Sequence, residues 1–317
     1  MARAQNSRSQ LAVAFEPSTY GTPPVAGDNA YWKVPFVSFG LGDEQPLLES
    51  DLLGFGRDPL APVLDVVTNE GDVVVPIDAE NFGIWLTGAF GAPTTTGTDP
   101  YTHVFDSGAF TLPSMVLEAG RPDITRFVRN KGARVNTLGW QMSRGGLLTA
   151  TVGMIAQGEM AATTATEAGT LTTLNRIRFA QAQGSVQREG TDVANVTAAS
   201  PTYTNNLDPI PTIRSDGLIE NVDPAIAAMT GQLTLRFDDG PLIGQALAGA
   251  PAAMTFGFDS GTESITVELP AVYLSRPRLP IEGPNGQEIT VDFQAAQPAN
   301  GDPMVTVTLV NHTASYI

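Results

Sequence analysis

The sequence contains no cysteine and only two histidines among its 317 residues. Without cysteine the chain can form no disulfide and has no thiol to act as a nucleophile or metal ligand. The histidines, His103 and His312, belong to no HExxH motif and to no Cys/His cluster. The residue types of a catalytic zinc centre or of a nucleophile–base pair are therefore missing, and we expect a structural role for both histidines.

Positive charge is also scarce. Lysine and arginine together number 17 against 33 acidic residues, which gives a formal net charge of −16. This balance argues against a protein that wraps DNA by neutralising its phosphates, because such proteins carry clustered basic residues. It is compatible with a protein past which DNA slides without sticking, and with acidity that serves only solubility.

Long apolar runs are absent too. No window of the sequence approaches the roughly 20 consecutive apolar residues that a membrane-spanning helix needs. The first residues, MARAQNSRSQLAVAF, lack the apolar core of a secretory signal. We expect neither a membrane span nor a membrane partner.

Motifs for nucleotide binding and catalysis are not found. Gly54-Phe55-Gly56 begins like a dinucleotide-binding fingerprint, but Pro59 stands where the third glycine belongs. Acidic turns at residues 238–240 and 259–263 hold oxygen ligands suited to calcium, yet neither has EF-hand spacing. We therefore expect no catalytic residue, no cofactor and no metal site, and we do not expect an enzyme.

Glycine, proline and β-branched residues are abundant. The 32 glycines and 24 prolines interrupt the chain too often for long helices. The β-branched runs between them favour many short strands. The length suggests two domains of ordinary size, each able to bury its own core. The sequence predicts a mainly β fold.

Several local elements are expected as well. Asn130-Lys131-Gly132 looks like a turn that leads into a longer strand, and residues 177–188 look like a hairpin. Residues 147–155 alternate with period two, which is typical of a strand with one covered face. Residues 282–286 are expected to form a hairpin tip before a strand over 288–293.

One pattern occurs twice. Residues 71–91, GDVVVPIDAENFGIWLTGAFG, read as a strand, an acid at its end and a short amphipathic helix. Residues 231–249, GQLTLRFDDGPLIGQALAG, repeat this order, and the helix pattern beginning at Ile243 matches the one beginning at Phe82 at a constant offset of 161 residues. In both halves two strands, a glycine-containing turn and a further strand follow. We interpret this as a duplicated β-rich domain, with chance similarity among small residues as the alternative.

The predicted organisation has four parts. Residues 1–30 form a loosely held N-terminal arm, and residues 31–162 form the first β domain, with a long connection over 40–70. The low-complexity segment 163–173 is the linker, and residues 174–317 form the second β domain. Apolar side chains on the long connection either fold back onto their own domain or cover a neighbouring subunit; they are Leu47, Leu48, Leu52, Leu53 and Phe55.

Four stretches of the chain, taken in order, carry a family resemblance. They are Glu16-x-x-x-Tyr20-Gly21-Thr22-Pro23, the segments 112–118 and 132–138, the strand 231–235 before the second helix, and the closing segments 269–272, 280–286 and 293–295. In this order the chain resembles the major tail tube proteins of long-tailed, siphovirus-type bacteriophages, of the larger type. The resemblance covers nearly the whole chain and rests on turn residues and strand alternation.

The resemblance implies a fold and a function. Two tandem tail-tube-like domains would each be packed antiparallel sheets, β-sandwich or barrel-like, with one flanking short α-helix. Their inner sheets would join neighbours around a channel, and rings would stack into a hollow tube for genome delivery. An acidic wall would repel phosphate, so that DNA passes without specific binding.

Partners follow from the same resemblance. The main partner is the chain itself: two tube domains per chain favour a ring of three chains with pseudo-sixfold symmetry, whereas a decorating second half would give a hexamer. Tape measure, tail terminator and distal tail proteins are the implied partners, in a virion assembled in the host bacterial cytoplasm. The alternative is a carbohydrate-active or glycan-binding acidic β-sandwich protein, which would need aromatic platforms; the available tryptophans are Trp32, Trp85 and Trp140.

Overall fold

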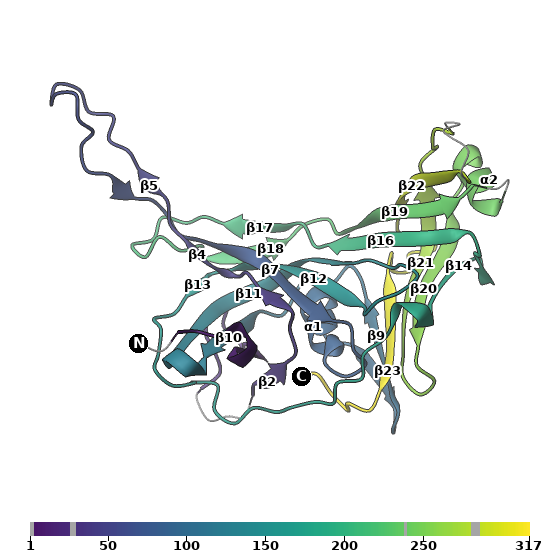
Figure 1. Ribbon diagram of the computed structural model, residues 1–317, viewed down its shortest axis with the longest axis horizontal. Helices are drawn as coiled ribbons and strands as arrows, with labels where there is room; N and C mark the ends of the chain where they lie inside the picture. Colours follow the sequence, from purple (N-terminus) through teal and green to yellow (C-terminus); the bar gives the residue numbers. More distant parts are fainter. Residues whose placement is uncertain (1–2, 26–29, 238–239, 280–285) are drawn as a thin grey trace.

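The computed structural model describes residues 3–25, 30–237, 240–279 and 286–317 (Figure 1). The fold is mainly β with antiparallel pairing between its named strands, which confirms the predicted class. The α-helices of the described chain are α1 (Phe82–Phe90) and α2 (Pro241–Ala248). The strands are β1 (Gln10–Phe15), β2 (Trp32–Val34), β3 (Ser38–Phe39), β4 (Gly42–Glu44), β5 (Leu47–Leu48), β6 (Val63–Leu64), β7 (Thr68–Pro76), β8 (Thr94–Gly97), β9 (Tyr101–Asp106), β10 (Met115–Arg121), β11 (Arg126–Trp140), β12 (Thr149–Ala156), β13 (Gly158–Glu159), β14 (Gly184–Arg188), β15 (Thr191–Asp192), β16 (Val196–Thr204), β17 (Leu207–Ile210), β18 (Asn221–Pro224), β19 (Ala228–Arg236), β20 (Ala252–Asp259), β21 (Ser264–Leu274), β22 (Glu288–Ala295) and β23 (Thr306–Asn311).

Strand β7 and helix α1 show how local sequence sets the central elements. Val73 is buried while its neighbour Asp72 is exposed, as alternation along a strand over a core requires. After the strand, the Asp78 carboxylate accepts hydrogen bonds from the backbone N–H groups of Glu80 and Asn81, at 2.9 and 2.6 Å. This turn leads the chain into α1. Burial raises the pKa of the Asp78 carboxyl.

One antiparallel sheet, here called the central sheet, runs through both halves of the chain. Its strand order is β4–β7–β12–β11–β16–β19–β22–β21, and β3 pairs with β7 beside β4. Figure 1 shows β7, β12, β16 and β19 running across the middle of the molecule. On the exposed face, one row of directly opposed residues crosses the sheet from β3 to β21, with one residue from each strand. The row is Ser38, Val74, Thr151, Gly139, Thr202, Thr230, Gln294 and Tyr273.

The other face of the central sheet covers the core. Its rows hold buried apolar side chains such as Val73, Val152, Leu138 and Met229. Helix α1 is buried along its whole length against this face. Two outer sheets complete the layers: β2–β1–β10–β11–β13 in the first half, and β8–β9–β23–β21–β20–β14–β15, in which the C-terminal strand pairs with β9.

The interpretation of residues 1–30 as a loosely held arm is wrong for β1. This strand lies between β10 and β2, with Leu11 and Val13 fully buried. The short run LAVAF shows no alternation of apolar and polar residues, because both faces of this strand are covered. The first part of the chain therefore belongs to the core of the first half.

Two further local predictions differ from the structure. A turn expected at Asn130-Lys131-Gly132 is instead part of the single long strand β11, in which Gly132 has a φ of 62° beside a register shift. A hairpin expected over residues 177–188 does not form, since β14 pairs with β20 far along the chain. The long connection over 40–70 contains three short strands, β4 to β6, and the beginning of β7. The predicted acid pair Asp238-Asp239 and most of the predicted hairpin tip at residues 282–286 lie outside the described residues.

The strands form two series with the same order and the same pairings. The series β1 to β7, α1 and β10 to β13 is repeated by β14 to β19, α2 and β20 to β23, in which the single strand β16 corresponds to β3 and β4 together. The pair Ser38↔Val74 has its counterpart in Ala198↔Thr234, with 160 residues between each residue and its equivalent. A register shift between Met115 and Leu117 recurs between Ala252 and Met254. The hairpin β8–β9 of the first series has no counterpart among the described residues.

Candidate assembly surfaces

The two series meet edge to edge at a joint between β11 and β16. The opposed pairs are Thr137↔Thr204, Leu138↔Tyr203 and Gly139↔Thr202. The joint continues the central sheet from one series to the other. The strands remain antiparallel across it, and the same face of the sheet remains exposed. It is an uncharged joint, made of threonine, leucine, tyrosine and glycine.

Buried polar and aromatic contacts fix this joint. Asn205 is 4% exposed, and its side-chain amide donates hydrogen bonds to the Ala89 and Val135 carbonyl oxygens, both at 2.9 Å. Its side-chain oxygen accepts a hydrogen bond from the Tyr203 hydroxyl at 3.0 Å. The Tyr203 ring stacks on Phe90 at the end of α1. A buried amide with all of these partners holds β16 in one register against the first series.

A hairpin from the second series lies over the first. Leu207 of β17 and Val222 of β18 form a buried cluster with Ile155 of β12 and with Leu112. The Arg134 guanidinium donates to the Val222 carbonyl oxygen and lies 5.1 Å from the centre of the Tyr20 ring. Burial lowers the pKa of Arg134. Hairpin β17–β18 thus has a defined receiving surface within the chain.

The equivalent hairpin β5–β6 has no such surface. It projects away from the body of the molecule in Figure 1. Its apolar side chains are exposed, including Leu53 at 92%, Phe55 at 69% and Leu52 at 64%. The sequence left open whether these residues fold back onto their own domain or cover a neighbouring subunit. In the structure they do not fold back. An exposed apolar segment of this size is typical of a surface that binds another chain.

The exposed face of the central sheet is polar. Its uncharged members are mainly threonine and glutamine, such as Thr151, Thr230 and Gln294. Its acidic members are Glu44, Glu70, Asp72, Glu288 and Asp292. The strand arginines on this face are engaged: Arg236 pairs with Glu288 at 3.3 Å, and Arg134 lies under hairpin β17–β18. This face carries no lysine within the named strands.

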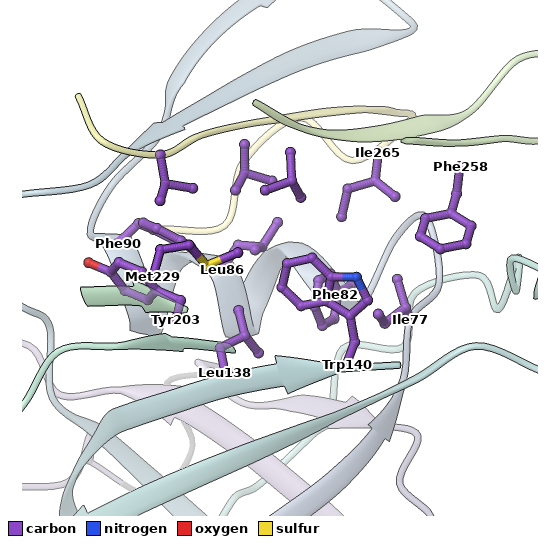
Figure 2. A pocket seen from close by; sticks show the side chains of 13 residues that line it. Ile77, Phe82, Leu86, Phe90, Leu138, Trp140, Tyr203, Met229, Phe258 and Ile265 are labelled. Atoms are coloured by element: carbon purple, nitrogen blue, oxygen red, sulfur yellow. The ribbon is translucent and has the colours of Figure 1, made fainter. Parts of the chain in front are cut away.

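The interior holds a small apolar cavity rather than a ligand pocket. Figure 2 shows Phe82 and Leu86 of α1 and Trp140 of β11 around this cavity, with Ile265 from β21 on its far side. The cavity has a volume of about 20 Å³, which is the size of a single water, and its lining offers almost no polar partner. It belongs to the packing between the two layers.

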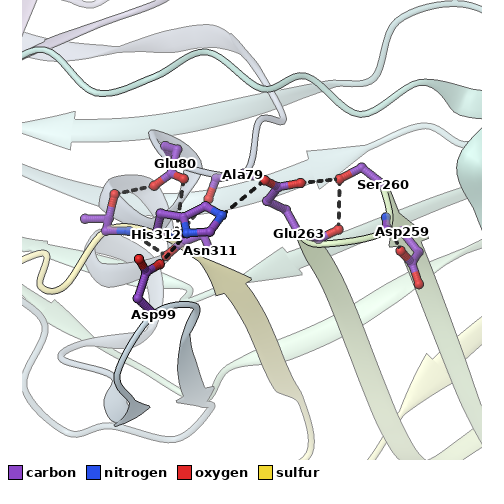
Figure 3. A network of polar contacts seen from close by, with 10 residues as sticks. Ala79, Glu80, Asp99, Asp259, Ser260, Glu263, Asn311 and His312 are labelled. Atoms are coloured by element: carbon purple, nitrogen blue, oxygen red, sulfur yellow. Dashed lines mark hydrogen bonds and ion pairs between the residues drawn. The ribbon is translucent and has the colours of Figure 1, made fainter.

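The two histidines lie in hydrogen-bond networks near the C-terminus. His103 is fully buried, and its ring nitrogens contact the Thr95 hydroxyl at 2.8 Å and the Thr313 carbonyl oxygen at 2.9 Å. His312 lies between Asp99 of the β8–β9 turn and Glu263 before β21 (Figure 3). The hydrogen bond with Asp99 raises the pKa of His312.

The acidic turn over residues 259–263 is closed by its own contacts. The Asp259 carboxylate accepts the backbone N–H of Gly261 at 2.6 Å, and Glu263 accepts the Ser260 hydroxyl at 2.8 Å (Figure 3). Within residues 3–25, 30–237, 240–279 and 286–317, no group of three or more His, Cys, Asp or Glu side chains could hold a metal ion. The same ranges contain no helix with the length and apolar character to cross a bilayer.

Comparison with known protein families decides the identity. A family model described as phage tail tube protein matches residues 6–295. The chain belongs to the phage tail tube protein family. No curated protein matches it. As a tail tube protein it is a structural component of the virion tail, which self-assembles into a tube with other tail components.

One stretch that carried the resemblance, around Glu16 and Gly21, has a structural role in the first half of the chain. The Glu16 carboxylate accepts the backbone N–H groups of Gly21 and Gly132, at 2.7 and 2.8 Å. The pKa of Glu16 is raised, because the effect of burial exceeds the opposing effect of these hydrogen bonds. The turn after β1 is thereby tied to the bulge in β11, so these motif residues support the fold of the first half.

Sequence reasoning singled out the apolar connection over 40–70, but it missed the joint between β11 and β16 and the equivalence of the two hairpins. Residues 38–76 and 198–236 have equal length and the same elements, so hairpins β5–β6 and β17–β18 are equivalent. The visible signals were Gly71 and Gly231, and Leu47 and Leu207, each pair separated by 160 residues. The repeat found in the sequence covers only residues 71–91 and 231–249, which come after these hairpins.

Proposed function

We propose that each chain supplies two tube domains, residues 10–162, which include β1, and residues 174–317, joined by the segment 163–173, and that three chains close a pseudo-sixfold ring. The internal joint between β11 and β16 is the observation that carries this proposal. It is an edge-to-edge strand pairing between two equivalent units, which is the contact that a ring of such units repeats.

The two ends of the central sheet support closure. At one end β3 and β4 pair only with β7 among the named strands, and at the other end β21 leads into residues 275–279. Open strand edges are templates for pairing with another chain. Pairing one end with the opposite end of the next chain would remove both edges and continue the central sheet around the ring.

The exposed face of the central sheet would then line the lumen. Its acidic residues repel DNA phosphates, and its arginines within the named strands are occupied by an ion pair or a carbonyl. Threonine and glutamine offer no net charge to hold a phosphate. A wall of this kind lets a genome pass without specific binding.

Hairpin β5–β6 would make the contacts that the isolated chain leaves open. Hairpin β17–β18 covers the first series of its own chain, and β5–β6 has the length and the exposed apolar side chains to cover a neighbouring chain or an adjacent ring. Tape measure, terminator and distal tail proteins would bind the finished tube, which would assemble in the host cytoplasm. The chain would act without catalysing a reaction.

Electron microscopy of the purified chain at high concentration tests this proposal. Hollow rings or tubes with a central channel are the expected result. A chain that stays monomeric, even when mixed with tail fractions from virions, would contradict it.

A further inference from the structure

We propose that an acid–base seam joins successive chains, in which Glu44 of one chain lies opposite Arg276 of the next and Arg278 extends across Gly42 toward Glu70. The inference rests on the ring proposed above and names the contact that closes it. The free edge of β4 is the edge that pairs with no named strand, and its proposed occupant is a second copy of this chain. The backbone of that copy would replace the Glu159 carboxylate, which accepts the Asp43 backbone N–H at 3.3 Å.

The register of this seam follows from the internal joint. On one side, Gly42 and Glu44 are equivalent to Thr202 and Thr204, since 160 residues separate the members of each pair and their partners on β7 and β19. Gly42 pairs with Glu70 just as Thr202 pairs with Thr230. The free edge of β4 therefore corresponds to the edge of β16 that contacts β11.

The other side of the seam is placed by the pairing of β21 with β22. The pair Tyr273↔Gln294 corresponds to Arg134↔Ile155, with 139 residues between equivalent positions. The Ser275 backbone N–H continues this pairing with a hydrogen bond to the Asp292 carbonyl oxygen at 2.8 Å. At the same spacing, Arg276 and Arg278 are the counterparts of Thr137 and Gly139.

Transferring the internal pairs to these positions brings opposite charges together. Thr137↔Thr204 becomes Arg276 opposite Glu44, and Gly139↔Thr202 becomes Arg278 opposite Gly42. Opposed residues of adjacent antiparallel strands have Cβ atoms about 5 Å apart, within reach of an ion pair. Because Gly42 has no side chain, the long Arg278 side chain can cross it toward Glu70 on the next strand.

The side chains that form the seam are available for it. Glu44, Glu70, Arg276 and Arg278 are exposed, and none of them takes part in an ion pair within the described part of the chain. Tyr273 of β21, the counterpart of Arg134, is 44% exposed although it is paired with β22 in the central sheet. Arg134 is covered by hairpin β17–β18, so Tyr273 marks where hairpin β5–β6 of the next chain would lie.

The charges distinguish the seam between chains from the joint within a chain. The internal joint is uncharged and forms while a single chain folds. The seam forms between separate molecules, where opposite charges speed encounter and fix orientation. Pro277 replaces Leu138 and has no N–H to donate, so the seam loses a strand hydrogen bond and depends more on its charges. Proline and charge also protect an open edge from indiscriminate pairing, which is the competing explanation of these residues.

Charge reversal tests the seam. Glu44→Lys and Arg276→Glu, each alone, are expected to lower the yield of sedimentable rings or tubes at least tenfold, and the double variant is expected to restore most of it. Matched controls are Glu268→Lys and Arg144→Glu, which reverse exposed charges elsewhere and are expected to assemble like the unaltered chain. Thermal unfolding of each variant shows that the chain is folded.

The outcomes separate the seam from the tube function. If the unaltered chain forms tubes and the single reversals assemble equally well, the charges only protect an edge and the seam is wrong. If the double variant stays as defective as the single ones, the proposed register is wrong. Failure of the unaltered chain to assemble would count against the proposed function itself.

The absence of cysteine allows a second, independent test. In the variant Glu44→Cys with Arg276→Cys, oxidation of assembled tubes is expected to link chains into covalent dimers and closed trimers on denaturing gels. The control Glu268→Cys with Arg276→Cys is expected to remain monomeric. A seam variant that assembles but gives no linked product would overturn the proposed register.

Discussion

Tyr203 of β16 stacks on Phe90 at the end of α1, with ring centroids 4.4 Å apart and planes inclined by 26°. The two residues come from the two series of strands and meet at their joint. Stacking of buried rings adds to the stabilisation that burial alone gives. The joint is therefore part of the folded core, and the two series are expected to unfold together.

Loss of Asn205 is expected to destabilise the joint. Asn205→Ala leaves the Ala89 and Val135 carbonyl oxygens and the Tyr203 hydroxyl without their partner in a buried place. The free energy of unfolding should fall by about 2–4 kcal/mol. Chemical denaturation followed by circular dichroism measures this. The exposed Asn6→Ala is the control, and an equal, small effect of both substitutions would show that the buried network contributes little.

Alkaline pH is expected to destabilise the fold through Tyr203. Burial raises the pKa of its phenol from 10.0 to about 12. A group whose pKa is higher in the folded state contributes stability that is complete below its ordinary pKa and is lost as pH rises through its folded pKa. Stability should therefore decline between about pH 10 and pH 12, by on the order of 2–3 kcal/mol from this residue. Tyrosinate absorbance during alkaline titration, with Tyr203→Phe as comparison, measures it; an unchanged titration curve in the variant would contradict the assignment.

The contact between His312 and Asp99 is expected to keep the imidazole charged above its ordinary pKa. Asp99 is the largest cause of the raised pKa, with Glu80 and Glu263 adding to it. Any stability from this contact is complete below the ordinary pKa of histidine and is lost as pH rises through the folded value. Asp99→Asn should move the pKa of His312 downward, as measured by NMR of the imidazole protons. Asp259→Asn, whose carboxylate contacts Gly261 instead, should leave it in place; equal shifts in both variants would refute a specific role for Asp99.

Hairpin β5–β6 is expected to matter for assembly and not for folding. Leu53→Ser with Phe55→Ser changes two side chains that are 92% and 69% exposed, so the free energy of unfolding should change by less than about 0.5 kcal/mol. Tube length in negative-stain micrographs should fall sharply. The comparison is Leu207→Ser in the equivalent, covered hairpin, which should lower stability itself. Normal tubes from the β5–β6 variant would contradict a contact role for this hairpin.

Local patterns predicted the elements that depend on neighbouring residues. The helix beginning at Phe82 and the alternation at the start of β12, where Ala150 and Val152 are buried and Thr151 is exposed, were correctly predicted from apolar spacing. Strand β1 was missed because its apolar run has no alternation, which is the pattern of a strand covered on both faces. The hairpin expected at residues 177–188 failed because β14 finds its partner in β20, a contact that no local pattern encodes.

The assembly surfaces were harder to predict for a related reason. The joint between β11 and β16 depends on which strand edges remain open after each series folds, and that is set by tertiary packing. Hairpins β5–β6 and β17–β18 share their length and position, whereas their residues have diverged apart from a few such as Leu47 and Leu207. Arg276 and Arg278 carry no motif, and only the register of β21 with β22 gives them a partner.

The number of chains in one ring tests the central claim most directly. Cryo-electron microscopy of the tube, averaged without imposed symmetry, is predicted to show threefold rings of three 33.3 kDa chains, with six similar lobes and both halves of each chain in the wall. Rings of six chains, with the second half of each chain projecting outward from the tube, would contradict the duplication and the seam that follows from it.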